Sequence, residues 1–353
     1  MSDLYQQAKK HFENKLPFVL YSKPNETVAV GIFQKDDSLH FATDFTEVGF
    51  VFAPFEGKDF VVLPEKESEI YIENYVLTPN KSTANSVAEA NTSAKENFEE
   101  LVQKGVDTIN EGDFKKVVLS RKESVVLKQI DIFLLFQKLL SAYPAAFKYC
   151  FFHPKIGLWL GATPEQLLKV SNDRIKTVAL AGTQVYHEGE ITWENKEQEE
   201  QQFVTEFILD GLKSYVAEQT ISEPYTFRAG NIVHIKTDIE ARLQNQEDLG
   251  MIIKILHPTP AVCGLPKKEA KEFILKNEGY DREYYSGFLG ELNKDFAKGQ
   301  EQNSDLFVNL RCMKVENKTA NLFIGCGITK DSIPGKEFLE TVNKSLTMKN
   351  ILG

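Results

Sequence analysis

The sequence NIVHIKTDIEARL, residues 231–243, alternates between apolar and polar side chains along its length. In an extended chain Val233 and Ile235 would lie on one face, and His234 and Lys236 on the other. Successive side chains of a β-strand point to opposite faces of its sheet, so this alternation is typical of a strand with one face in the core. The segment therefore predicts a long, half-buried strand.

Other strands and helices are predicted on both sides of this segment. The remaining predicted strands are the one that begins at Lys116 and those at 18–22, 28–33, 60–63, 147–160, 174–181, 285–291, 305–315 and 320–328. Helices are predicted at 97–112, 131–142, 196–217, 246–255 and 267–276, and from about 335 onward. Most strands follow one another without regular helix alternation, which favours an α+β fold with large antiparallel sheets packed in layers and flanked by helices.

Composition excludes several classes of protein. The 353 residues are 42% hydrophobic and carry a net charge of −10, which argues against a nucleic-acid or anionic-membrane binder. The polar N-terminus lacks the apolar core of a signal peptide, and no apolar stretch is long enough to cross a membrane. The four cysteines form no CxxC pair, as expected in a reduced compartment. We expect a cytoplasmic monomer.

One internal boundary is predicted. Residues 79–96 are poor in large apolar side chains and read as a flexible connector. This divides the chain into a β-rich N-terminal segment, 1–90, and a larger region, 91–353. We expect the first segment to pack into the same domain as the second.

Lys116 and Glu165 are candidates for a base and an acid. Lys116 begins the strand KVVLSR, and Glu165 follows a proline in GATPE. A lysine base and a carboxylic acid on opposite sides of one substrate could add water and expel a hydroxyl group. The simpler alternatives are a surface lysine at a strand end, and an acid at a turn into a short helix.

The predicted helix 196–217 places carboxylates on its apolar side. At 100° per residue, Glu200 lies near the middle of the apolar stripe, with Glu197 one turn earlier on the same side, whereas Glu199 and Glu206 point away. A carboxylate on a buried face needs a partner, and a divalent cation such as Mg²⁺ would provide one. A frayed first turn favoured by the helix dipole is an equally good explanation.

The last helix carries a second set of charges. Glu337, Glu340 and Lys344 share one face, opposite an apolar face. A solvated face with a Glu340–Lys344 pair, which contributes about 0.2–0.5 kcal/mol, explains this spacing without any function.

Other residues suit anion recognition. Arg311, placed on a strand face, could bind a carboxylate with two hydrogen bonds or lie at a rim. Glycines at Gly182-Thr183 and around Gly325 could bring backbone N–H groups close to an anion. His234 belongs to a polar strand face, for which a solvent-facing side chain is the simpler interpretation.

Taken together, ten segments resemble the chorismate-utilising enzymes, and among them the isochorismate synthases. They run in order through about residues 95–351: FKKVVLSR, GATPEQLL, VALAGT, KEQEEQ, NIVHIKTDIEARL, LHPTPAVCGLP, EGYDREYYSGFLG, FVNLRC, IGCGI and FLETVNKSLTM. The resemblance implies the fold of that family and a chorismate-binding catalytic region at 91–353.

The resemblance also implies roles for individual residues. Lys116 aligns with the lysine that activates water, and Glu165 with the acid that protonates the departing C4 hydroxyl. Glu200 and Glu340 align with Mg²⁺ ligands, and Glu197 and Glu337 with acidic support nearby. The positions aligned with the substrate pocket are Gly182, Thr183, His234, Ala261, Tyr285, Arg311, Gly325 and Lys344.

The implied reaction is the Mg²⁺-dependent, reversible isomerisation of chorismate to isochorismate, for menaquinone or siderophore biosynthesis. A salicylate synthase, which goes on to eliminate pyruvate, is the first alternative. Ala261 favours the isomerase, because lyase and aminating relatives tend to place threonine nearby. A catalytically silent chorismate-binding protein is the second alternative.

Overall fold

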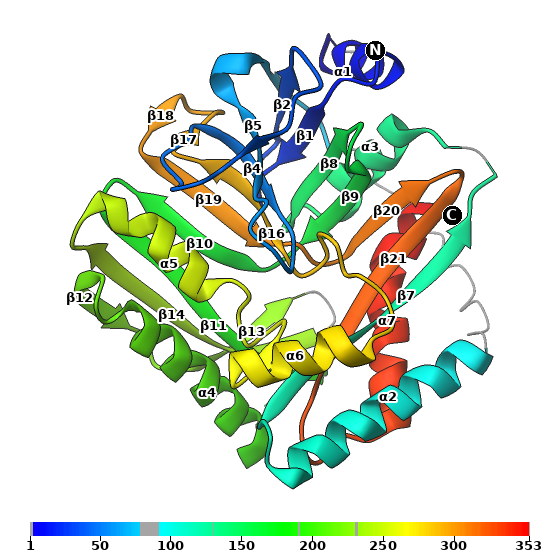
Figure 1. Ribbon diagram of the computed structural model, residues 1–353, viewed down its shortest axis with the longest axis vertical. Helices are drawn as coiled ribbons and strands as arrows, with labels where there is room; N and C mark the ends of the chain where they lie inside the picture. Colours follow the sequence, from blue (N-terminus) through cyan, green and yellow to red (C-terminus); the bar gives the residue numbers. More distant parts are fainter. Residues whose placement is uncertain (1–2, 78–91, 129, 190, 230–231, 353) are drawn as a thin grey trace.

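Two large antiparallel sheets form the centre of the fold. The computed structural model describes residues 3–77, 92–128, 130–189, 191–229 and 232–352 (Figure 1). The first sheet has nine strands in the spatial order β15 (Gly264–Leu265), β7 (Lys116–Val126), β21 (Thr319–Ile328), β20 (Cys312–Glu316), β9 (Gly157–Thr163), β8 (Phe147–His153), β1 (Phe18–Ser22), β2 (Val28–Gln34) and β6 (Ser68–Asn74).

The second sheet is also antiparallel. Its path is β12 (Val216–Ile221), β14 (Ile232–Leu243), β11 (Arg174–Val185), β10 (Gln166–Ser171), β19 (Asn303–Val308), β16 (Phe288–Leu292), β4 (Gly49–Ala53), β5 (Val61–Pro64) and β3 (His40–Phe41), with β13 (Tyr225–Ala229) paired to β14. Strands β17 (Lys294–Asp295) and β18 (Gln300–Glu301) form a separate ribbon.

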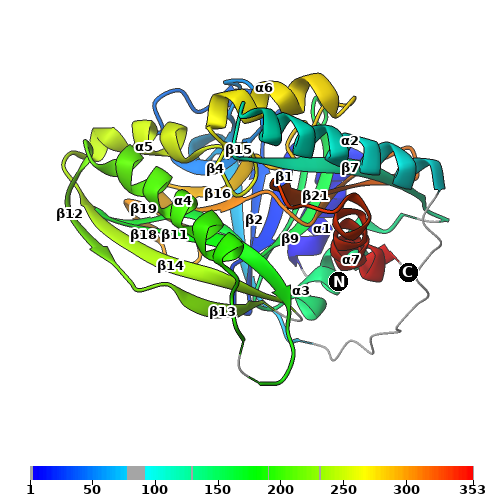
Figure 2. The same ribbon diagram turned by 90° about the horizontal axis from the view of Figure 1, so that it is seen from below.

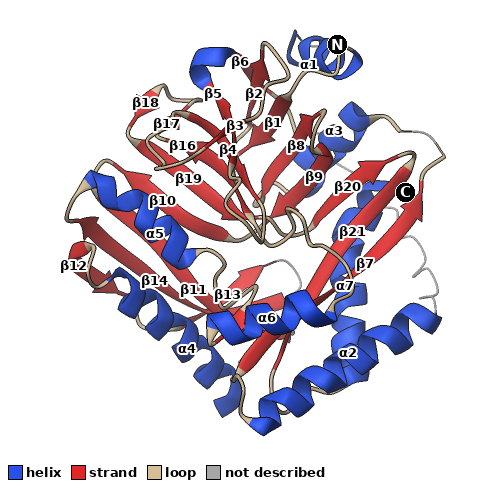
Figure 3. Ribbon diagram, in the orientation of Figure 1, coloured by secondary structure: helices blue, strands red, loops and turns tan. Residues whose placement is uncertain are grey.

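Helices cover the outer faces of both sheets (Figure 3). They are α1 (Asp3–Glu13), α2 (Thr92–Glu111), α3 (Ile132–Ala142), α4 (Asn195–Leu212), α5 (Leu249–Leu256), α6 (Lys267–Asn277) and α7 (Pro334–Leu352), with short 3₁₀ turns η1 (Glu65–Glu67) and η2 (Gln246–Asp248). Figure 2 shows α2, α5 and α6 along one side of the molecule and β13 on the opposite side. Among the described residues, no helix is long and apolar enough to cross a membrane.

An aromatic core lies between the sheets. Phe52 of the second sheet stacks on Phe151 of the first at 4.3 Å between ring centroids, and Phe147 stacks on Phe307 at 4.5 Å. On the outer faces, α4 and α5 pack on the second sheet, whereas α1, α3 and α7 pack on the first. Burial of these apolar faces, at roughly 25 cal/mol per Å², is what joins the four layers.

The predicted fold class is confirmed, and within the segment 231–243 the residues Ile232–Leu243 form β14. The strands of the first 74 residues enter both sheets, while the predicted boundary at 79–96 falls largely outside the described residues. The division into 1–90 and 91–353 stays a prediction. Two predicted elements were too long. The helix predicted to end at 217 ends at Leu212, and the strand predicted at 305–315 is broken between β19 and β20.

Candidate active site

One cavity collects the charged side chains that the sequence pointed to. It has a volume of about 120 Å³ and is bounded by β7, β11, β14, β21, α4, α7 and the loops between the sheets. The predicted site residues that line it are Lys116, Glu165, Gly182, Glu200, His234, Ala261, Tyr285, Arg311, Gly325, Glu340 and Lys344. Lys116 and Glu165, which are far apart in the sequence, therefore line the same cavity.

Glu165 and Arg311 are placed by two crossings of the chain between the sheets. Glu165 lies between β9 of the first sheet and β10 of the second, and Arg311 lies between β19 of the second and β20 of the first. The Val308 N–H donates to the Glu165 carbonyl at 2.9 Å, and the Ala162 N–H donates to the Arg311 carbonyl at 3.1 Å. These bonds hold the two crossings side by side.

Both positions correct the sequence interpretation. Glu165 precedes a strand rather than a short helix, so helix capping does not explain it. Arg311 is not on a strand face, because its backbone adopts φ 47°, in the left-handed region that L-residues rarely occupy.

Lys116 is buried rather than at the surface. It begins β7, its exposed fraction is 6%, and its Nζ lies 2.5 Å from Oε1 of Glu200 on α4. Gly327 of the neighbouring strand leaves room for this pair, since a Cβ there would lie 3.3 Å from Lys116 Cε and 3.6 Å from Glu200 Oε1. The apolar stripe on α4 thus carries a carboxylate that faces the buried amino group of Lys116.

The charged face of α7 is turned toward the cavity and is not a fully solvated face. Glu340 and Lys344 form an ion pair at 2.6 Å, with 33% and 18% of their side chains exposed. Lys344 also donates to the Gly325 carbonyl at 3.0 Å. Glu340 lines the cavity, whereas Glu337 interacts with the thiol of Cys326.

His234 faces the cavity and not the solvent. Its Nδ1 lies 2.9 Å from the carbonyl oxygen of Gly182, and because a carbonyl only accepts, the histidine donates from Nδ1. Burial lowers the pKa of His234, so the ring is neutral at pH 7 and Nε2 carries the lone pair. Gly182, at φ 68°, lies where the pairing of β11 with β14 changes register. The side chain of Thr183 lies outside the described residues.

Tyr285 and Ala261 come from loops. Tyr285 precedes β16, which begins at Phe288 and not at 285 as predicted, and it is 3% exposed. Its hydroxyl lies 2.7 Å from where a Cβ of residue 325 would be, so only glycine fits at Gly325 beside it. Ala261 lies in the loop between α5 and β15 and also lines the cavity.

The carboxyl of Glu165 has a strongly raised pKa. Burial raises the pKa of Glu165 to about 7, and the opposing positive charges of Lys116, Arg311 and Lys344 only partly counter this effect. Near neutral pH, a large fraction of Glu165 is protonated and can donate a proton. This is the state that a general acid requires.

A cation would fit beside α4, where Glu197 and Glu200 lie, although these carboxylates alone do not supply a full set of metal ligands. Oε2 of Glu197 is buried and makes no hydrogen bond to any described residue, and the Glu197 side chain packs against Gly182, where a Cβ would lie 3.0 Å away. Within the described ranges, no three acidic, histidine or cysteine side chains gather closely enough to hold an ion alone. A cation bound by one or two carboxylates plus water and substrate oxygens, as Mg²⁺ often is, agrees with both observations.

Some wall residues were not predicted. Val118, Leu180 and Leu310 supply apolar surface, and Gly327 supplies space. The repeated glycines of GCG were a usable signal for Gly327, but the apolar residues look like any other core side chains in the sequence. Conversely, Glu197 and Glu337 do not line the cavity, although both lie next to residues that do.

Residues 61–353 match the family described as chorismate binding enzyme. The salicylate biosynthesis isochorismate synthase of Pseudomonas aeruginosa is 30% identical over 78% of this chain and 58% of its own length. Isochorismate synthase EntC of Escherichia coli is 29% identical over 72% of this chain and 67% of its own length. The chain thus spans less than two thirds of the first of these relatives.

Structural comparison agrees with the sequence match. DhbC from Bacillus anthracis has a TM-score of 0.80 at 24% identity, over 98% of this chain and 99% of that one, which shows a shared fold. The family match covers most of the chain, including every predicted site residue from Lys116 to Lys344. The chain therefore belongs to the chorismate binding enzymes.

Proposed function

We propose that this chain is an isochorismate synthase, which isomerises chorismate to isochorismate by adding water at C2 and expelling the C4 hydroxyl. The observation that carries the proposal is the shared cavity, in which Lys116 and a Glu165 of raised pKa are both wall residues. The names of the two sequence relatives support the same activity.

In this proposal Lys116 and Glu165 move protons. Lys116 accepts a proton from the water that attacks C2, and the ring double bonds shift as the C4–O bond breaks. Glu165 donates its proton to the departing oxygen, which leaves as water. Base and acid exchange roles in the reverse direction, so the reaction is reversible.

Other wall residues orient the substrate. Arg311 and Lys344 bring positive charge for carboxylates, and the neutral His234 can accept a hydrogen bond at Nε2. Glu200 and Glu340, supported by Glu197 and Glu337, would hold Mg²⁺. When bound, Mg²⁺ supplies positive charge for the C1 carboxylate.

A single assay separates this function from its alternatives. The purified protein is incubated with chorismate and Mg²⁺, and the products are identified by NMR. Isochorismate at an equilibrium ratio, reached from either side, supports the proposal. Salicylate and pyruvate in equal amounts as main products would identify a salicylate synthase, and unchanged chorismate would identify a silent binding protein.

The pH dependence should show the titration of Glu165. The acid form donates the proton and is lost above its pKa of about 7. The slope of log kcat/KM against pH should therefore fall by about one unit on crossing pH 7. The break should disappear in Glu165→Gln. A wild-type profile with no change of slope between pH 6 and 8 would contradict this assignment.

Glu200→Ala should weaken the metal dependence. Loss of a proposed ligand should raise the Mg²⁺ concentration for half-maximal activity by at least roughly 10-fold, because even loss of an outer-shell partner of a metal ligand costs about 10- to 100-fold in metal affinity. Calorimetric Mg²⁺ titration in the presence of chorismate gives a second readout that needs no turnover. Glu199→Ala is the matched control, because Glu199 is exposed on the same helix. Equal Mg²⁺ affinity in the two variants would remove Glu200 from the metal site.

A further inference from the structure

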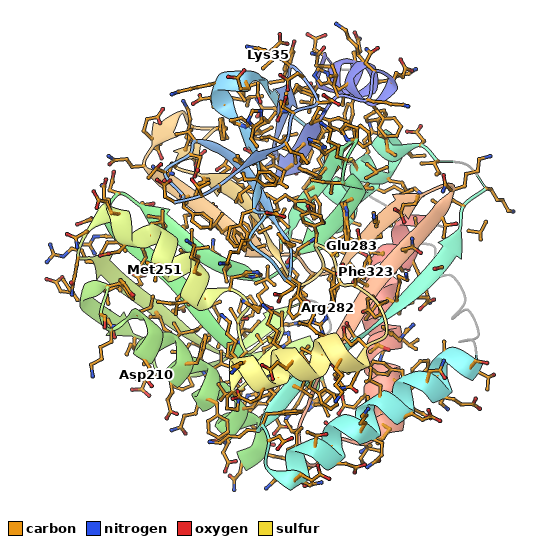
Figure 4. The ribbon with its side chains drawn as sticks, in the orientation of Figure 1. Lys35, Asp210, Met251, Arg282, Glu283 and Phe323 are labelled. Carbon is orange, nitrogen blue, oxygen red and sulfur yellow. The ribbon has the colours of Figure 1, made fainter. Side chains whose placement is uncertain are left out.

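A buried ion pair outside the cavity wall connects three of the segments that form it. Arg282 and Glu278 lie in the segment after α6, with 2% and 1% of their side chains exposed. Nε and Nη2 of Arg282 donate to the two oxygens of Glu278 at 2.7 and 2.5 Å, which is a bidentate arrangement. In Figure 4, Arg282 lies near the centre of the molecule, beside α6.

The remaining contacts of this pair reach the backbone of the wall. Nη2 of Arg282 donates to the Val118 carbonyl at 2.6 Å, and Nη1 donates to the Val262 carbonyl at 3.0 Å. Oε1 of Glu278 accepts from both the N–H and the hydroxyl of Ser120, at 2.7 and 2.9 Å. Val118 and Val262 are themselves wall residues.

Val118 and Ser120 are on the same face of β7 as Lys116. On the edge opposite β21, β7 pairs at Lys116 and Val117 with the two-residue strand β15. Beyond this short pairing, the Arg282 guanidinium replaces strand-to-strand hydrogen bonds, because it joins the backbone of β7 to the loop that contains Ala261. Arg282 also lies 5.7 Å from the ring centroid of Tyr285, so its position is tied to a third part of the wall.

We propose that Arg282, held by Glu278, is a positioning residue that sets where Lys116 lies relative to the loop of Ala261 and to Tyr285. The inference rests on the isomerase function proposed above. A flat guanidinium can bond two carbonyls and a carboxylate at once, which the single ammonium of a lysine does not reproduce in that geometry. If a mutation far from the reacting atoms displaces a catalytic group by about 1 Å, the rate can fall by roughly 100-fold.

The test compares three variants, Arg282→Lys, Glu278→Gln and Glu291→Gln. The last is the matched control. Like Glu278, Glu291 is a buried glutamate in an ion pair, but its partner is Lys23 and neither residue lines the cavity. For each variant, kcat, KM, the chorismate dissociation constant, the melting temperature and amide exchange at 117–120 are measured. The two variants of the pair should lower kcat by about 10- to 100-fold, with much smaller changes in chorismate binding.

Two readouts keep the outcome clear. Exchange of the Ser120 amide should accelerate in Glu278→Gln and Arg282→Lys but not in Glu291→Gln, whatever the activity. A fall in melting temperature in all three variants, with kcat within about twofold of wild type and unchanged exchange at Ser120, would overturn the positioning role. If wild-type protein does not convert chorismate, the proposed function fails, and the exchange data still test the inference.

Discussion

Replacing Lys116 with alanine should reduce turnover of chorismate by about 100- to 10,000-fold, the range expected when a general base is lost. Lys116 is buried at the start of β7 and lines the cavity, and its partner Glu200 would remain. Arg311 and Lys344 are unchanged in this variant and can still attract the substrate carboxylates, so chorismate should still bind with measurable affinity. Steady-state rates, together with binding measured by calorimetry, separate loss of the base from loss of the site.

The matched control is Lys115→Ala. Lys115 is the neighbouring lysine, and it is exposed. Its Nζ lies over the ring of Phe203 at 4.5 Å, so a modest loss of stability is expected without loss of turnover. Added primary alkylamines should restore part of the rate in Lys116→Ala, because a small amine can occupy the space left by the side chain. Wild-type rates in Lys116→Ala would show that another group activates the water.

The regular elements could be predicted because their sequence patterns are local. The alternation over 231–243 arises because one face of β14 is buried, and it can be seen in these consecutive residues alone. Likewise, the stripe on α4 placed Glu197 and Glu200 on its inner side before any neighbour of that helix was known. Such features depend on a few consecutive residues.

The crossings between the sheets could not be predicted in the same way. Whether the residue after β9 continues in its own sheet or passes to the other depends on distant strands, so Glu165 was assigned to a helix start and Arg311 to a strand face. The burial of Lys116 has the same origin, since Glu200 and Gly327 come from other parts of the chain. The roles of these residues were accessible only through resemblance, and they stay predictions until tested.

Replacing Glu165 with glutamine should lower the rate by about 100- to 10,000-fold in both directions, because the same carboxyl donates a proton in one direction and accepts it in the other. Glutamine preserves the size of the side chain, but its amide is far too weak an acid to protonate the departing hydroxyl. The rates are measured from chorismate and from isochorismate, and the ratio of products at equilibrium should not change.

A raised pKa alone does not identify a catalytic acid, since buried ion pairs shift pKa values for structural reasons. Glu291 provides the comparison within this chain. Burial also raises its pKa to about 7, but it hydrogen-bonds Tyr21 at 2.5 Å and pairs with Lys23 away from the cavity. We expect Glu291→Gln to change the melting temperature and leave the rate near that of wild type. If Glu165→Gln behaved as Glu291→Gln does, the raised pKa of Glu165 would reflect burial alone, and the proton of the leaving hydroxyl would come from another donor.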